Sequence, residues 1–347
     1  MPSDPPRAAS LMQAEIAEIP DAIERLLIGS AGAIADAGAL LRRLSPPVVA
    51  TVARGSSDHA ASLFKIACEI LSGVPVTSLG PSTASIYGTV PRLAGAAALA
   101  VSQSGRSPDL VTALQAARQG GAATIAIVNA EGSPLAEAAD ITIPLRAGPE
   151  RSVAATKTFV GSAVAALGVL AAWREDAALQ EALHRLPAIL RAAPPAGWSG
   201  ALVEFASASS LYVLGRGPGL AMAMEAALKF KETSILHAEA FSSAEVQHGP
   251  MSLVQAGFPV LAFLQGDAAR PGMLATMTQL AAQGGRVFLA GGEAPGAVTL
   301  PVPVTGHPLT DCIAAIAAFY RFVEALSRAR GLDPDNPPHL RKVTETL

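Results

Sequence analysis

The chain has 347 residues, half of them hydrophobic and 15% charged, which suits two domains with their own cores and excludes a disordered chain. The net charge of −3 and the lack of a basic run argue against nucleic acid and anionic membranes as partners. Cys68 and Cys312 lie far apart in apolar segments, and neither has metal-ligand or redox spacing. Such cysteines suit a reducing compartment, so we expect a cytoplasmic protein.

Residues 1–32 are expected to form a helical lead-in. The chain begins with polar and proline-rich sequence, so we do not expect a signal peptide. Further on, Val160–Trp173 is apolar but shorter than the roughly 20 residues that cross a bilayer. We therefore predict a buried helix there and no membrane association.

Short apolar segments alternate with helix-like segments, and the order repeats. In the first half we predict strands at 48–53, 97–101, 124–128 and 141–144, with helices after Ser57 and at 108–119. The second half repeats this order, with strands at 211–214, 260–263, 287–289 and 298–302 and helices after Pro218, at 273–283 and at 310–330. Such alternation specifies parallel sheets covered on both faces and joined by right-handed crossovers. The prediction is an α/β fold with two doubly wound, three-layer domains in tandem.

Composition sets the expected domain boundaries. The first domain is placed at 33–190 and the second at 200–332, with the proline-rich segment 191–198 as their linker. Residues 333–347 begin with a proline-rich stretch that cannot be helical, so this tail is expected to run across a surface.

A loop rich in hydroxyl groups separates the predicted strand 97–101 from the following helix. It contains Ser102, Gln103, Ser104, Gly105 and Ser107. Hydroxyls and backbone N–H groups at the positive end of a helix dipole bind phosphate, and glycine lets the backbone approach an anion closely. The alternative is an ordinary strand-to-helix turn capped by Ser107. The equivalent loop of the second half carries Asp267, which would repel phosphate, so we expect one phosphate site per chain.

Three ionisable residues, Glu225, Lys229 and Glu232, share one face of the helix after Pro218. His248 follows shortly afterwards in a constrained turn before Gly-Pro. A carboxylate, a lysine and a histidine close together are what proton transfer requires. The alternatives are a solvated helix face with surface ion pairs and an ordinary surface histidine.

Taken together, these motifs resemble the double sugar isomerase (SIS) module of the glucosamine-6-phosphate synthase family, over roughly residues 35–347. The matching segments are Ser102-Gln103-Ser104-Gly105, 153–157, 225–232, 237–240, 248–250 and Lys342. The resemblance implies two SIS domains of the flavodoxin-like type that bind a sugar phosphate without a metal or another cofactor.

The resemblance also implies roles for individual residues. The phosphate would be held by Ser57, Ser102, Gln103, Ser104 and Ser107. In the family a glutamate moves a proton between C1 and C2, a histidine from the neighbouring subunit assists ring opening and a tail lysine meets the open-chain carbonyl. The matching residues here are Glu232, His248 and Lys342. The same motifs add Lys229 for catalysis and, for substrate binding, Arg54, Gly55, Ser56, Val153, Ala155, Glu225 and Arg341. A homodimer is thus expected, with the tail closing the active site.

The chain departs from the synthase pattern at positions that bear on the reaction. Pro2 stands where the synthase has its glutaminase cysteine, and little sequence precedes the first SIS domain, so we expect no use of glutamine. Arg54 and Arg106 replace a cysteine and a glutamate. Guanidinium groups favour phosphate, although surface ion pairs are the alternative. Ala155 lacks the hydroxyl of the family's serine, which removes one substrate contact.

The segment Ala53–Ala60 resembles that of stand-alone SIS proteins that act as glucosamine-6-phosphate deaminases. The leading hypothesis is therefore an isomerase that releases fructose 6-phosphate and ammonia. Ammonia-dependent synthesis of glucosamine 6-phosphate, or isomerisation or deglycation of another hexose phosphate, is an alternative. A non-catalytic phosphosugar sensor is another, although the N-terminal segment is too short and insufficiently basic for a DNA-binding helix-turn-helix.

Overall fold

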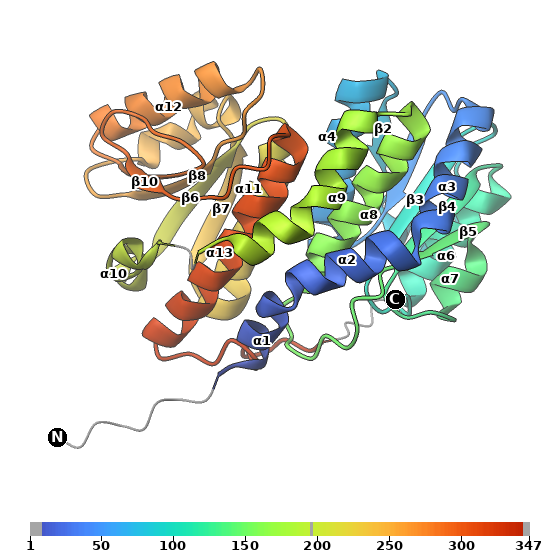
Figure 1. Cartoon of the computed structure of the whole chain (residues 1–347), viewed down its shortest axis with the longest axis horizontal. Helices are drawn as coiled ribbons and strands as arrows, with labels where there is room; N and C mark the ends of the chain where they lie inside the picture. Colours follow the sequence, from blue (N-terminus) through green and yellow to red (C-terminus); the bar gives the residue numbers. More distant parts are fainter. Residues whose placement is uncertain (1–8, 195–196, 343–347) are drawn as a thin grey trace.

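The part of the chain that the structure describes forms two parallel five-stranded sheets, each covered by helices (Figure 1). The computed structural model describes residues 9–194 and 197–342. The strands are β1 Val49–Val52, β2 Val76–Ser78, β3 Ala97–Ser102, β4 Ala123–Val128, β5 Ile141–Pro144, β6 Ser210–Gly215, β7 His237–Ser242, β8 Pro259–Phe263, β9 Arg286–Ala290 and β10 Val298–Leu300. The first sheet has the order β2-β1-β3-β4-β5, and the second has the order β7-β6-β8-β9-β10. All pairs of neighbouring strands are parallel.

The two sheets share one topology, because β6 to β10 take the places of β1 to β5 in the same order. This confirms the predicted tandem of doubly wound α/β domains. Two strands were missing from the prediction, β2 and β7. The former has only three residues, and β7 is an edge strand in which only Ala238 is buried. Neither carries the continuous apolar sequence that marks a central parallel strand.

Helices cover both faces of each sheet. They are α1 Leu11–Ala17, α2 Ile19–Gly29, α3 Ala31–Leu44, α4 Ser56–Ser72, α5 Pro81–Ser85, α6 Pro108–Gln119, α7 Pro134–Ala138, α8 Lys157–Arg174, α9 Ala177–Ala192, α10 Ser199–Ser207, α11 Pro218–Ser234, α12 Arg270–Ala282 and α13 Pro308–Ala329, with the short 3₁₀ helices η1 Glu245–His248 and η2 Pro250–Leu253. The helix predicted at 108–119 is α6, and that predicted at 310–330 is α13 within two residues at each end.

The largest apolar core is shared by the two domains. It contains side chains of α4 and α8 from the first domain and of α11 and α13 from the second, and α4 packs directly against α11. Figure 1 shows α11 and α13 on the side of the second sheet that faces the first domain. Smaller cores lie on the outer faces, under α6 and α7 in one domain and under α12 in the other.

The two helices at this domain interface begin alike. Gly55 precedes α4 with φ 54° and ψ −133°, and Gly217 precedes α11 with φ 53° and ψ −131°. Side chains other than glycine are strained at such positive φ angles. The repeated glycine therefore allows each domain to turn sharply from its first strand into the helix that packs against the other domain.

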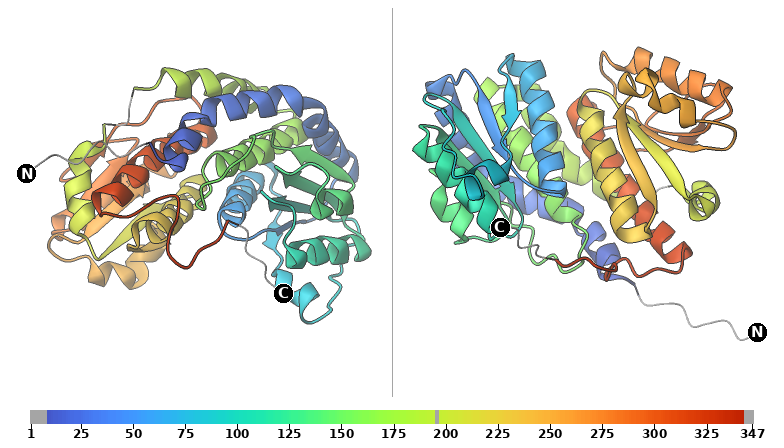
Figure 2. Two further views of the ribbon diagram at one scale, coloured as in Figure 1. Left: turned by 90° about the horizontal axis from the view of Figure 1, so that it is seen from below. Right: turned by 180° about the vertical axis from the view of Figure 1, so that it is seen from behind.

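The two ends of the described chain lie together on one side of the molecule. Helices α2 and α3 pack against α8, and α1 packs against α13. After α13 the tail crosses back from the second domain to the first, as both views of Figure 2 show. The predicted lead-in, linker and tail extend into residues 1–8, 195–196 and 343–347, which lie outside the described residues.

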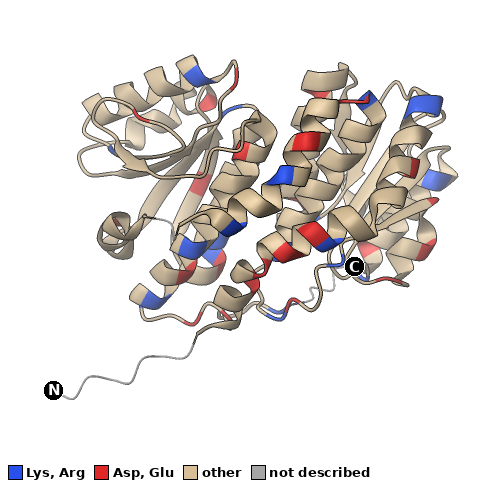
Figure 3. Ribbon diagram, in the orientation of Figure 1, with Lys and Arg blue, Asp and Glu red and all other residues tan. Residues whose placement is uncertain are grey.

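The predicted apolar helix at Val160–Trp173 is part of α8, in which residues 157–171 are all buried. None of the described helices combines the length and the apolar character that a membrane span needs. Both cysteines are free and buried. Lys and Arg are interspersed with Asp and Glu over both domains (Figure 3).

Helix α3 approaches α8 so closely that Gly38 is required. A Cβ at Gly38 would lie 2.5 Å from the Cβ of Ala172 and 2.8 Å from backbone atoms, whereas a Cβ at Gly32, on the same helix, meets nothing within 4 Å. We expect Gly38→Ala to lower the free energy of unfolding by about 1 to 3 kcal/mol, because backbone must move. Gly32→Ala should change stability little or raise it by up to about 1 kcal/mol. Urea denaturation of both variants measures the difference, and equal effects would contradict this packing.

Candidate active site

The serine-rich loop lies where β3 ends and α6 begins. The hydroxyl oxygen of Ser102 accepts a hydrogen bond from the backbone N–H of Gly105 at 3.1 Å, and that of Ser104 accepts one from Arg106 at 3.3 Å. Both hydroxyl protons remain available to donate to an anion. Ser107 is the N-cap residue of α6, but its side chain makes no capping hydrogen bond. The alternative of a simple serine-capped turn therefore does not describe this loop.

Gly105 is the residue that allows the loop to close. It has a φ of 61°, and a Cβ there would lie 2.0 Å from the hydroxyl oxygen of Ser133. The Ser133 hydroxyl is buried and has no hydrogen-bond partner among the described residues. Any side chain at position 105 would thus both strain the backbone and displace Ser133.

Arg54 ties the first glycine loop to the serine-rich loop. Its Nε and one terminal nitrogen lie 3.0 and 2.9 Å from the same carboxylate oxygen of Asp109, a fully buried residue of α6. Arg54 therefore forms an ion pair, with a buried carboxylate rather than at the surface, and its binding of phosphate stays a prediction. Arg106 is exposed.

The equivalent loop of the second domain is filled by its own side chains. Gln265 donates to the carbonyl of Arg216 at 2.7 Å and to the carboxylate of Asp267 at 3.0 Å. Asp267 in turn accepts the N–H of Ala269 at the start of α12 at 2.9 Å. An acid thus stands in the loop that corresponds to the serine-rich loop, and the expectation of one phosphate site per chain stays a prediction.

The ionisable stripe of α11 faces the first domain. Glu225 and Lys229 have fully buried side chains, and that of Glu232 is 21% exposed. The Lys229 ammonium lies 3.5 Å from the Glu225 carboxylate and forms a short ion pair with Glu232. The solvated-face alternative is therefore wrong: α4 covers α11 because the two helices pack together in the shared core.

Residues from α4 and α13 complete the hydrogen bonds of Glu225. Its carboxylate accepts from the Ser56 hydroxyl at 3.1 Å, from His59 Nδ1 at 2.9 Å and from the Tyr320 hydroxyl at 2.9 Å. Ser56 also accepts a hydrogen bond from Lys229 at 2.9 Å. The cluster thus joins both domains through largely buried groups, of which His59 and Glu232 are 14% and 21% exposed.

The charges of this cluster stabilise one another. Burial alone would raise the pKa of Glu225, but Lys229 and the hydrogen bond from His59 hold it below its ordinary range. Burial alone would lower the pKa of Lys229, but Glu225 and Glu232 hold it above its ordinary value. Burial and the Glu225 carboxylate keep the pKa of Tyr320 well above its usual value, so its hydroxyl stays a donor.

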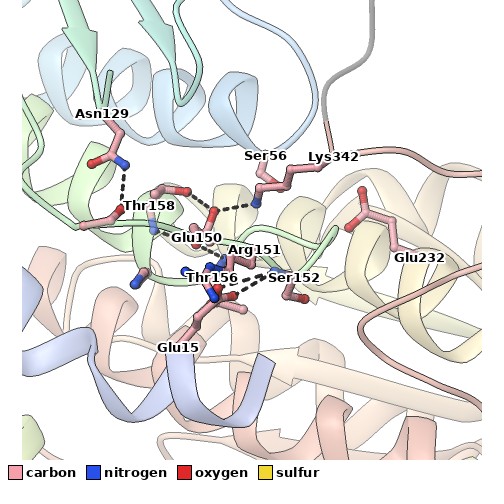
Figure 4. Close-up of polar contacts among 12 residues, drawn as sticks. Glu15, Ser56, Asn129, Glu150, Arg151, Ser152, Thr156, Thr158, Glu232 and Lys342 are labelled. Atoms are coloured by element: carbon pink, nitrogen blue, oxygen red, sulfur yellow. Dashed lines mark hydrogen bonds and ion pairs between the residues drawn. The ribbon is translucent and has the colours of Figure 1, made fainter. Parts of the chain in front are cut away.

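The tail lysine ends at a buried carboxylate of the first domain (Figure 4). Lys342 Nζ lies 2.9 Å from Glu150, which also accepts from the Thr158 hydroxyl at 2.6 Å and from the N–H groups of Thr156 and Thr158. Burial alone would raise the pKa of Glu150, yet Lys342 and Thr158 hold it below its ordinary range. The Glu150 charge also acts on Lys229. The tail lysine and the α11 cluster are therefore linked through the charge of Glu150.

The loop after Glu150 presents further polar groups. Its backbone N–H groups at Arg151 and Ser152 are bound by the carboxylate of Glu15 from α1 (Figure 4). The hydroxyls of Ser152 and Thr156 are buried without a hydrogen-bond partner among the described residues. Within this loop the predicted substrate residues Val153 and Ala155 are partly exposed.

His248 does not join the cluster within this chain. It lies on the exposed turn η1, after the edge strand β7, and no hydrogen bond or ion pair links it to the α11 residues in the described part of the chain. Arg341 is exposed beside Lys342. The structure thus brings together Ser56, Glu225, Lys229 and Glu232, pairs Lys342 with Glu150 and leaves His248 outside this cluster.

Several residues of the site escaped the sequence analysis. His59 lies inside the segment Ala53–Ala60, and Glu150 lies just before the motif at 153–157, so each had a neighbouring signal. Tyr320 and Glu15 had none, because neither lies in a motif that the sequence analysis recognised. No group of three or more His, Cys, Asp or Glu within residues 9–194 and 197–342 is arranged to hold a metal ion.

Comparison with known families shows to which family the chain belongs. A model of the SIS domain matches residues 47–171 and 204–290, more than half of the chain. The chain belongs to the SIS domain family. Its curated relatives include the glutamine–fructose-6-phosphate aminotransferases of Aeropyrum pernix, 35% identical over 91% of this chain and 52% of the relative, and of Halobacterium salinarum, 33% identical over 95% and 58%. This SIS protein therefore spans about half the length of these relatives.

Solved structures agree with this family. A candidate phosphosugar isomerase from Silicibacter pomeroyi is 50% identical, with a TM-score of 0.91 over 94% of this chain and 100% of the other. The C-terminal domain of glucosamine-fructose-6-phosphate aminotransferase from Francisella tularensis is 25% identical, with a TM-score of 0.84 over 96% and 100%. A glucosamine-6-phosphate deaminase from Thermotoga maritima, 19% identical with a TM-score of 0.73 over 97% and 100%, shares the fold. The predictions of family, fold class and an enzyme are thereby confirmed.

Because Glu225 is buried and ionised, the free energy of unfolding should depend on pH. Glu225→Gln should lower the free energy of unfolding at pH 7 by about 2 to 4 kcal/mol, because Lys229 loses a buried partner. Since the folded-state pKa of Glu225 is lowered, its stabilising effect is full above the ordinary value of about 4.5 and is lost as the pH falls through the folded value. The difference between wild type and variant should therefore shrink in acid. Glu181→Gln, at an exposed position, is the control for urea denaturation at pH 7 and below pH 4, and a pH-independent difference would contradict this account.

Proposed function

We propose that the protein is a glucosamine-6-phosphate deaminase, which converts its substrate and water to fructose 6-phosphate and ammonia. The observation that carries the proposal is the arrangement of Glu232. Its carboxylate is the solvent-accessible end of a buried chain of charges, held by Lys229, which is linked to Lys342 through the charge of Glu150. A purely structural ion pair would not need a carboxylate that is partly open to solvent.

Substrate binding is assigned to the loops of the first domain. The phosphate would lie against Ser57, Gln103 and the free hydroxyl protons of Ser102 and Ser104, where the chain leaves parallel strands at the edge that commonly binds ligands. Glu232 reaches the site from the second domain. Binding energy from the phosphate would thus hold the sugar carbons against the catalytic carboxylate.

Proton transfer follows ring opening by His248. Glu232 would remove the proton on C2 of the open-chain aldehyde and return it to C1, while O1 takes up one proton that the C2 ammonium group of the substrate gives up. This leaves an iminium group at C2 and a hydroxyl at C1. The ammonium groups of Lys342 and Lys229 would offset the negative charge that develops on O1 and on the enolamine. Water then adds to C2, and ammonia leaves as the C2 carbonyl forms, which balances the reaction.

Ammonia-dependent synthesis is the second candidate. It is the reverse of the same reaction, and it is favoured by the curated relatives, which are named as aminotransferases. Both directions use the same proton transfer. A cytoplasmic location and a sugar phosphate partner belong to the proposal in either case.

The active site is proposed to be shared between two subunits. His248 is exposed and separated from Glu232 in its own chain, as expected for a residue that acts in a partner's site. A homodimer of this kind places each His248 opposite the other chain's Glu232.

Turnover should depend on Glu232. Purified protein incubated with glucosamine 6-phosphate, or with other amino-sugar phosphates, should release ammonia and a ketose phosphate in equal amounts. Glu232→Gln should reduce turnover at least about a thousandfold while phosphosugar affinity changes only a few-fold, because the proton carrier is lost and the phosphate loop is kept. Glu181→Gln, at an exposed position on α9, should match wild type. Full turnover by Glu232→Gln would refute the assignment.

Mixed dimers test the shared site. When Glu232→Gln and His248→Ala proteins exchange subunits at random, half of the sites in each mixed dimer carry neither lesion. Activity should then return to about a quarter of wild type at equal mixing. If both residues act within one chain, every site keeps one lesion and the mixture stays inactive despite exchange. That result would rule out an active site shared between subunits and would not contradict the proposed deaminase reaction.

A further inference from the structure

Helix α1 connects the C-terminal tail to the first domain (Figure 2). The carboxylate of Asp335, in the tail, accepts the backbone N–H groups of Leu11 and Met12 at 2.7 and 2.8 Å. Ser10, the N-cap residue of α1, donates its hydroxyl to Glu324 of α13 at 2.7 Å. The start of α1 is therefore bound by the tail and by α13, the helix that precedes the tail.

Helix α1 also contacts the loop that carries the carboxylate for Lys342. Glu15 is 5% exposed, and its carboxylate accepts the N–H groups of Arg151 and Ser152. These residues directly follow Glu150, whose side chain binds Lys342 at 2.9 Å. One short helix thus binds both the tail and the loop on which the tail ends.

We propose that α1 is a clamp, in which Asp335 and Glu15 are positioning residues that hold Lys342 in the active site. The role given to Lys342 in catalysis rests on the proposed function. The clamp itself is a statement about the tail and can be tested without any substrate.

The tail needs such an anchor because it has little structure of its own. After α13 it forms no helix or strand in its described part, and Leu340 and Arg341, just before Lys342, are exposed. An unanchored segment samples many conformations, and each residue that is fixed costs conformational entropy. Binding of Asp335 to α1 shortens the free segment before Lys342, which raises the local concentration of the ammonium group near Glu150.

Trypsin measures the clamp directly, because Arg341 and Lys342 are its cleavage sites in the tail. Wild type, Asp335→Ala and Glu15→Ala are digested in the native state, and cleavage at these two residues is followed by mass spectrometry. Gln13→Ala is the matched control, since Gln13 is an exposed residue of the same helix. Thermal unfolding of each variant checks that the two domains stay folded.

Both clamp variants should be cleaved at least about tenfold faster than wild type, because each loses a carboxylate that accepts the N–H groups of two residues and cleavage follows the population of the open tail. Gln13→Ala should be cleaved like wild type. Asp335→Asn keeps one acceptor oxygen, so its cleavage rate should lie between those of wild type and Asp335→Ala. It replaces Asp335→Ala in the test if that variant does not fold. Equal cleavage rates in folded wild type and clamp variants would overturn the proposal.

Kinetics separate the clamp from the proposed reaction. If the deaminase activity is present, Asp335→Ala should lower kcat about tenfold or more and leave binding of inorganic phosphate within about twofold, since the serine-rich loop is untouched. An unchanged kcat in a variant with a released tail would overturn the link between clamp and catalysis. If wild type turns over no amino-sugar phosphate, the proposed function fails, and the cleavage rates still decide whether α1 holds the tail.

Discussion

The arrangement of the whole molecule depends on the buried ammonium group of Lys229. An unpaired charge there would be prohibitively costly, and it is tolerated because carboxylates of Glu225 and Glu232 lie against it and Ser56 accepts from it. Two of these partners lie on α11, and Ser56 lies on α4 of the other domain. The domains must therefore meet with these helices in one register, or a buried charge loses its partners.

The shared core and the charge cluster stabilise each other. Apolar packing of α4, α8, α11 and α13 excludes water, which strengthens the hydrogen bonds and ion pairs inside. The polar cluster in turn specifies one relative position of the domains, because hydrogen bonds depend on direction and apolar contacts do not. The Glu232 end is partly open to solvent, so the same interaction that joins the domains also presents the carboxylate that is proposed to be catalytic.

The remaining parts of the site come from the two ends of the chain. Lys342 reaches Glu150 from the tail, and Glu15 supports the loop after Glu150 from the first helix. Segments that look like a lead-in and a trailing end in sequence are thus structural neighbours. The site depends on their docking as much as on the repeated domains.

The sequence by itself determined the repeat, the central strands and the serine-rich loop, because apolar periodicity and glycine or hydroxyl residues at turns are local properties. It also placed Glu225, Lys229 and Glu232 on one face of a helix. It did not show the short strand β2, the edge strand β7, or whether the charged face met water or protein. Only the tertiary structure decided that α4 covers this face, that Arg54 pairs with Asp109, and that His59, Tyr320, Glu150 and Glu15 complete the site. Those contacts join residues distant in the chain, and burial and pairing of charges depend on the packing of whole domains rather than on any local pattern.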